Sequence, residues 1–227
     1  RMGEHNVVIA GGMESMSNAP QLLMGQRKGK KMGDSKLVDS MIHDGLWDVY
    51  NDMHMGNTGE VVARECSINR EQADAFSVQS HKKAAKAWDE GWFDWETFAL
   101  EIPQRRGEPV LLERDEGIRP DSSVEHLSTL RTVFDKDGIV TAGNASTLND
   151  GASAVLVTSE EFAKEQGWEI LATIEDYCTA GVEPERVMSA PIPAVKNLLE
   201  RNNLSVLDVD VYEHNEAFAS ASCAVAQ

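Results

Sequence analysis

The sequence has few cysteines, and they are not arranged for a disulfide framework or a metal site. Cys66, Cys178 and Cys223 are far apart and show no C-x-x-C spacing, and the six histidines are dispersed. Disulfide-stabilised domains carry denser, paired cysteines, and a metal site needs His and Cys at short spacing. We therefore expect three small buried thiols, no metal, and a reducing compartment, the cytoplasm.

Long apolar runs and an excess of positive charge are also missing. A membrane-spanning helix needs roughly 18–20 consecutive apolar residues, whereas runs such as 152–157 have the length of a buried strand. The chain carries 21 Lys and Arg against 38 Asp and Glu, a net charge of −17. Because an acidic surface repels phosphate groups, neither nucleic acid nor a membrane is expected as a principal partner. A local basic patch would still allow an anionic ligand.

The short motifs of several enzyme classes do not occur either. The chain has no G-x-G-x-x-G turn, no Walker A loop, no H-E-x-x-H helix and no G-x-S-x-G elbow. The usual signals of dinucleotide binding, phosphate-loop binding, zinc peptidases and α/β-hydrolases are therefore absent.

Strand-like and helical segments alternate along the 227 residues, which indicates an α/β architecture. Strands are expected at 6–10, 97–104, 108–116, 152–157, 170–177 and 209–213, and helices at 36–43, 67–93, from 123, 160–166, 193–202 and after Asn215.

The helix expected at 67–93 has the clearest boundaries. Asn69 and Gln72 stand in capping-box register, and Gly91 is placed to end the helix. One stripe at helical spacing, which we interpret as a core contact rather than a ligand-binding face, consists of Ala73, Phe76, Ser80, Ala84 and Ala87.

Two stretches place polar and small residues where a ligand could lie. In "DMHMGNTGE", His54 lies between methionines, so it is either a structural histidine or the polar centre of a small acyl pocket. In "TAGNASTLNDGAS", Gly143 and Ala145 allow close approach of a ligand and Ser146 offers a hydroxyl. The Asn and Asp side chains of this stretch could instead bond within their own turn.

A third stretch, "HNEAFAS", joins an expected strand to an expected helix. Asn215 could hold a water or donate to a developing oxyanion there. The alternative is that Asn215 is the N-cap of the helix that follows.

Taken together, four stretches resemble the thiolases in order and spacing: "GGMESMS", "MHMGNTGE", "TAGNASTLNDGAS" and "HNEAFA". "MGDSKLVDSMIHDGLWD" and "IRPDSSVEHLSTLRTVFDKDGIVTAGNAS" are most similar to the acetyl-CoA acetyltransferase branch. The resemblance implies a Claisen condensation of CoA thioesters, or its reversal, through an acyl group carried on a cysteine thiolate.

The resemblance also implies a fold and an assembly. The fold would be the layered α-β-α-β-α thiolase fold with mixed sheets and an inserted loop domain, incomplete at both ends of this chain. By the same resemblance, the assembly would be a dimer or a tetramer of identical subunits. The corresponding segments would be the end of the N-terminal half at 1–17, the inserted CoA-binding and tetramerisation domain at 18–148, the return to the N-terminal half at 149–170, and the start of the C-terminal half at 171–227.

The same resemblance assigns roles to individual residues. Asn215 would hold the water of an oxyanion hole. The substrate, an acyl-CoA, would contact Leu46, His54, Met55, Arg119, Ala142, Ser146 and Phe218.

Three groups that carry the family's chemistry do not occur in this chain: the Cys-x-Ser-Gly-type nucleophile motif, the G-H-P segment and the C-x-G-G-G segment. We therefore expect an enzyme that condenses two acetyl-CoA to acetoacetyl-CoA, or cleaves the product, with its nucleophilic Cys, catalytic His and second Cys outside these 227 residues. No cofactor is expected beyond the CoA thioester substrate. The alternatives are a non-catalytic CoA-binding or thiolase-partner fragment and a longer-chain 3-ketoacyl-CoA thiolase.

Overall fold

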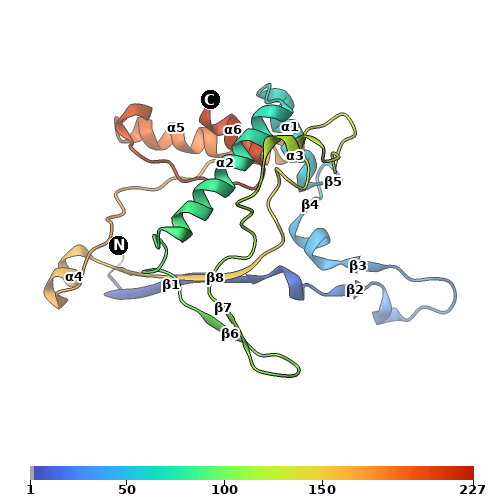
Figure 1. Ribbon diagram of the computed structural model, residues 1–227, viewed down its shortest axis with the longest axis horizontal. Helices are drawn as coiled ribbons and strands as arrows, with labels where there is room; N and C mark the ends of the chain where they lie inside the picture. Colours follow the sequence, from blue (N-terminus) through green and yellow to red (C-terminus); the bar gives the residue numbers. More distant parts are fainter. Residues whose placement is uncertain (1–2) are drawn as a thin grey trace. The chain divides into compact units, whose positions relative to one another are not determined.

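The computed structural model describes residues 3–227, which form two compact units (Figure 1). Within the described residues, no helix combines the length and apolar character needed to cross a membrane. The first unit comprises the chain up to Trp47 with Leu148–Gly181 and Ile192–Asp210, and the second comprises Asp48–Thr147, Val182–Pro191 and Val211–Gln227. These units are not the segments expected from the resemblance, which follow the two halves of the thiolase fold. Those segments stay predictions: 1–17, 18–148, 149–170 and 171–227.

A long antiparallel ribbon dominates the first unit (Figure 1). It pairs β1 (Val7–Ser15) with β8 (Asp150–Thr158) over their full lengths. The strand expected at 6–10 was thus too short. It continues through Gly11 because the backbones approach closely there, and a Cβ on Gly11 would lie 2.4 Å from the Ser153 carbonyl oxygen.

A second hairpin follows, where a helix was expected at 36–43. Instead, β2 (Gln21–Leu23) pairs with β3 (Leu37–Asp39), and a π-helical turn follows at Met41–Gly45. The helix prediction was wrong because the ladder with β2, which lies far away in the sequence, provides the backbone hydrogen bonds of 37–39. Short 3-10 turns occur in the same unit at Met16–Asn18, Gln26–Lys28 and Val206–Asp208.

Two expected strands, at 170–177 and 209–213, are irregular in the structure. Their sequences have strand character, and apolar side chains such as Leu171, Ile174 and Val211 are about 70% exposed. A strand is stable only when a neighbouring strand accepts its hydrogen bonds, and no strand of residues 3–227 pairs with either segment. The helices of this region match the predictions closely: α4 (Glu160–Gln166) and α5 (Pro191–Arg201).

Helices form the core of the second unit. The elements α1 (Met55–Glu65), α6 (Ala219–Ala226) and the 3-10 turn Pro184–Ser189 pack together, and α2 (Arg70–Asp89) packs on α6 (Figure 1). The predicted capping box of α2 is confirmed, because Asn69 accepts from the Gln72 amide while Gln72 accepts from the Asn69 amide. The buried cluster consists of Val62, Ala63, Ile68, Val140, Phe218, Ala221 and Ala224.

The shorter elements of this unit also follow from local signals. The hairpin of β6 (Leu100–Ile102) and β7 (Val110–Leu112) contains Gly107 at a positive φ of 88°. Ser123 caps α3 (Val124–Ser128) by accepting from the His126 amide. The remaining pair of two-residue strands is β4 (Trp47–Asp48) and β5 (Met53–His54).

Two buried carboxylates attach the 139–144 segment to the helices. Glu60 on α1 is 2% exposed and accepts from the Ile139 amide at 2.9 Å and the Val140 amide at 2.8 Å. Asp74 on α2 is 1% exposed and accepts from the Asn144 side chain at 2.8 Å and from Arg70 at 2.7 Å. A buried carboxylate is tolerated when such donors replace water.

The Asn144→Asp substitution tests this attachment. It replaces the donor to Asp74 by a second carboxylate, so we expect destabilisation of about 3 kcal/mol at neutral pH. The deficit should shrink in acid, because protonating one of the two carboxyls restores a donor. Chemical denaturation at pH 8 and pH 5 measures both effects. Gln79→Glu, on the exposed face of α2, is the matched control. A deficit that does not depend on pH would contradict the attachment.

An ion pair anchors the irregular 170–181 segment to the end of α5. Asp176 accepts from Arg201 Nε at 2.7 Å and from the Asn202 side chain at 2.9 Å. These bonds, first that from Arg201, lower the pKa of Asp176 from 3.8 to about 2.

Because this pKa is lower in the folded state, the pair contributes stability above pH 3.8 that is lost as the pH falls toward about 2. We expect Arg201→Met to remove that loss, so that the stability of the variant changes less between pH 5 and pH 2.5 than that of the original protein. Urea midpoints at the two pH values provide the measurement, and Lys196→Met, an exposed substitution on the same helix, is the control. Equal acid sensitivity in Arg201→Met and Lys196→Met would refute the anchor.

Candidate functional site

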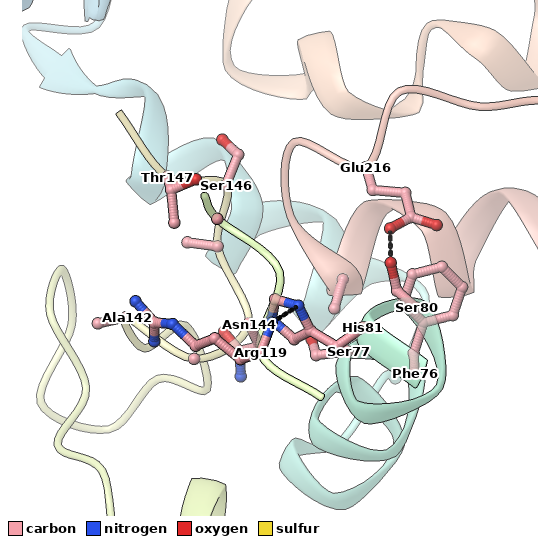
Figure 2. Close-up of a pocket in the computed structure, with 14 residues that line it drawn as sticks. Phe76, Ser77, Ser80, His81, Arg119, Ala142, Asn144, Ser146, Thr147 and Glu216 are labelled. Atoms are coloured by element: carbon pink, nitrogen blue, oxygen red, sulfur yellow. Dashed lines mark hydrogen bonds between the residues drawn. The ribbon is translucent and has the colours of Figure 1, made fainter. Parts of the chain in front are cut away.

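A small cavity of about 130 Å³ lies within the second unit (Figure 2). One side is the face of α2 that carries Phe76, Ser80 and His81. The other sides are the segment at 117–119, the loop at 142–147, and Glu216 with Ala219. Segments far apart in the sequence thus meet around one space.

The loop at 141–147 is held rigidly by its own bonds. The Asn144 side chain accepts from the Thr141 amide at 2.8 Å, and Thr141 in turn accepts from the Gly143 amide at 3.2 Å. The loop also bonds to the start of α6, because the Ser146 amide donates to the Ala217 carbonyl and the Ala219 amide donates to the Asn144 carbonyl, both at 2.9 Å. These bonds leave the Ser146 side chain exposed beside the cavity.

Gly143 has a packing role that the sequence did not indicate. It lies along the cavity, but a Cβ on it would lie 2.7 Å from Leu130 and 2.9 Å from Leu127. The glycine therefore lets the loop pack against α3 and the residues after it. The close approach expected for a ligand is taken here by leucine side chains.

Polar contacts form the wall between α2 and the two segments that face it. The Ser80 hydroxyl donates to the Glu216 carboxylate, and the Arg119 amide donates to His81 Nδ1 at 3.2 Å (Figure 2). Burial first, and then the Arg119 charge, lower the pKa of His81 below 6.5, while Glu216 opposes the shift. His81 is therefore neutral at pH 7.

An aromatic row lies in the same unit, between α1 and α6. The His54 ring stacks on Phe134 with centroids 4.7 Å apart, and Phe134 meets Phe218 edge-on at 6.4 Å. His54 Nδ1 accepts from the Gly56 amide at 2.9 Å, so Nε2 carries the proton of the neutral ring. Burial lowers the pKa of His54, which favours that neutral form.

The structure brings together only part of the predicted site. Arg119, Ala142 and Ser146 line the cavity. His54 and Met55, half-buried at the start of α1, are not among its lining residues, and Phe218 is 8% exposed within the core. Leu46 belongs to the first unit.

Asn215 is exposed and precedes Glu216, which lines the cavity. It does not cap α6, because that helix begins at Ala219 with Phe218 at the N-cap position and has no side-chain cap. The capping alternative for Asn215 is therefore wrong, and a role in ligand chemistry stays a prediction.

Sequence reasoning missed the α2 wall. Phe76 and Ser80 were assigned to a core stripe, whereas both line the cavity, and His81 and Glu216 received no role. The polarity of Ser80 could have indicated this wall, since Ser80 is the one polar residue in a stripe otherwise made of alanine and phenylalanine. The segments at 117–119 and 142–147 cover this face of α2, and local sequence patterns do not predict where these segments lie.

The cysteines and acidic groups provide no further chemistry here. Cys66, Cys178 and Cys223 are free and half-buried. Burial raises the pKa of the Cys223 thiol, which makes it a poor nucleophile at neutral pH. No group of three metal-binding side chains occurs within residues 3–227.

Comparison with known proteins gives a consistent result. The model of the thiolase N-terminal domain matches residues 1–161 and that of the thiolase C-terminal domain matches 168–227. A probable acetyl-CoA acyltransferase of Staphylococcus aureus is 50% identical over 223 residues, which cover 98% of this chain and 57% of that protein. The chain therefore spans somewhat more than half the length of the curated relatives it matches.

Solved structures agree with this similarity. Bacillus anthracis acetyl-CoA acetyltransferase superposes with a TM-score of 0.93 at 40% identity, over 99% of this chain and 56% of that one. Human mitochondrial 3-ketoacyl-CoA thiolase, solved in complex with CoA, superposes with a TM-score of 0.89 at 39% identity, over 97% and 54%. The thiolase fold expected from the motifs is confirmed, and the chain belongs to the thiolase family.

Proposed function

We propose that this protein takes part in thiolase chemistry on short CoA thioesters, joining two acetyl-CoA to give acetoacetyl-CoA and CoA or running the reverse thiolysis. The observation that carries the proposal is the cavity, where Arg119, Ala142 and Ser146 meet although they lie in separate segments. The family resemblance assigns Ala142 and Ser146 to the pantetheine arm of CoA and Arg119 to its adenine end.

The cavity suits a thin, polar ligand segment. At about 130 Å³ it holds a few ligand atoms, so it would receive part of the pantetheine arm rather than a nucleotide. Ala142 leaves room for the arm, the Ser146 hydroxyl can bond one of its amides, and the Arg119 guanidinium attracts the phosphates. The similarity to a thiolase solved with CoA supports this assignment.

The acyl end of the substrate would extend toward the aromatic row. His54, with its proton on Nε2, can donate to a thioester or enolate oxygen, and Met55 and Phe218 would supply apolar contact. Asn215, exposed and free of a capping role, would hold the water that donates to the tetrahedral oxyanion. The nucleophilic Cys, the catalytic His and the second Cys would come from outside this chain.

Longer 3-ketoacyl-CoA substrates are the second candidate. The similarity to human mitochondrial 3-ketoacyl-CoA thiolase favours them almost as strongly as the Bacillus anthracis structure favours acetyl-CoA. The family resemblance of His54 and Met55 favours short acyl groups. Comparing acetoacetyl-CoA with 3-ketooctanoyl-CoA as thiolysis substrates separates the two, and we expect a higher kcat/KM for acetoacetyl-CoA.

The first experiment is the intact mass of the protein purified from its source. A mass well above 25.0 kDa, with further Cys- and His-bearing peptides, supports the catalytic proposal. A mass of 25.0 kDa would refute catalysis by this chain alone and would favour a CoA-binding protein or a partner of another thiolase.

Asn215→Ala tests the chemical role. Removal of one oxyanion donor lowers kcat about 10²–10³-fold, and because the ground-state thioester does not need that donor, KM should change little. Steady-state thiolysis of acetoacetyl-CoA measures both constants, with the exposed Gln79→Ala as control. An unchanged kcat for Asn215→Ala would exclude it from the oxyanion site.

A further inference from the structure

We propose that neutral His81 is a positioning residue that fixes the segment carrying Arg119 to α2, so that affinity for CoA depends on the protonation of a side chain outside the chemical machinery. The inference rests on the proposed function, because it assumes that CoA binds at the cavity. It concerns the wall between α2 and the residues at 117–119 (Figure 2).

The tether between α2 and the segment at 117–119 is a single hydrogen bond from a backbone amide to the His81 side chain. The Arg119 amide donates to His81 Nδ1 at 3.2 Å, and this requires a lone pair on Nδ1. The neutral ring with its proton on Nε2 has that lone pair, whereas the imidazolium carries protons on both nitrogens and cannot accept. Protonation of His81 therefore breaks the bond.

The bond restrains a segment with few regular partners. Arg119 precedes Pro120, and its carbonyl accepts from the Ser122 amide at 3.1 Å, which closes a turn. His81 holds the amide side of the same residue, so Arg119 is bonded at both its nitrogen and its oxygen. Gly117 and Arg119 both line the cavity, and loosening this residue moves one of its walls.

Burial is the main cause of the neutral His81 ring, and the charges around it act in opposite directions, because Arg119 lowers its pKa and Glu216 raises it. Arg119 faces it from the cavity segment, Glu216 faces it from the segment before α6, and Lys82 and Lys83 follow it on α2. On α3, Glu125 interacts with Lys82. Burial and the Arg119 charge hold the pKa of His81 below 6.5, so the bond is intact at neutral pH and is lost once the pH falls below the pKa of His81.

The sign of the effect distinguishes tethering from simple charge attraction. An added positive charge on His81 would, by Coulomb attraction alone, strengthen binding of the CoA phosphates in acid. Loss of the tether weakens binding instead. A His81-dependent fall in affinity in acid is therefore the signature of positioning.

The test compares three versions of the purified protein by calorimetric titration with CoA at pH 8 and pH 5.5. His81→Asn keeps an acceptor oxygen near the Nδ1 position but does not titrate, and His81→Leu keeps neither property. We expect His81→Leu to bind about fivefold more weakly at pH 8, since a hydrogen bond contributes about 1 kcal/mol. His81→Asn should bind as the original protein does at pH 8 and lose less affinity in acid. His126→Asn, an exposed substitution on α3, is the control for general effects of histidine removal.

A second readout does not depend on ligand. Hydrogen–deuterium exchange at pH 8 should be several-fold faster for the peptide containing Arg119 in His81→Leu than in the original protein, and restored in His81→Asn. If the original protein does not bind CoA, the proposed function fails while the exchange experiment still reports on the tether. If it binds CoA but both variants share its affinities at both pH values and its exchange rates, the positioning role is overturned.

Discussion

The hydrogen bond between the Asn144 carboxamide and the buried Asp74 carboxylate is the contact on which the site depends. It connects the loop at 141–147 to α2, and the same carboxamide organises the loop by accepting from the Thr141 amide. With the loop fixed, Ser146 and Ala217 join the loop to the residues before α6. Since this bond lies in a region where water is excluded, an unpaired partner would be costly, and one loop conformation is strongly preferred.

The cavity combines rigid and conditional parts. Thr141, Asn144 and Glu60 are buried, and their bonds hold the loop at 141–147 and the segment before it. The wall at Arg119 is exposed and depends on an imidazole. In the proposed arrangement, the loop with Ala142 and Ser146 stays in place, while the position of Arg119 depends on the protonation of His81. The CoA thioester proposed as substrate is long and anionic and would have to enter and leave, and the conditional wall would serve that requirement.

Several local features could be predicted because they depend on residues close together in the sequence. The capping box at Asn69 and Gln72, the start of a short helix at 123 and the helix at 160–166 each follow from side chains within a few positions. The family was predicted from four long motifs in order, which the comparisons confirmed. The residues alone left Asn215 open between an oxyanion donor and an N-cap, because both roles place an Asn before a helix, and the resemblance favoured the first.

The sequence by itself thus determined the family and the helices α2, α4 and α5, since each is encoded by neighbouring residues or by motif order. Only the tertiary structure decided that 37–39 pairs as a strand while 170–177 does not, because strand formation depends on a partner elsewhere in the chain. It also decided that Phe76 and Ser80 face a cavity rather than the core. Helical periodicity identifies which residues share a face of α2, but what covers that face depends on segments more than 35 residues away.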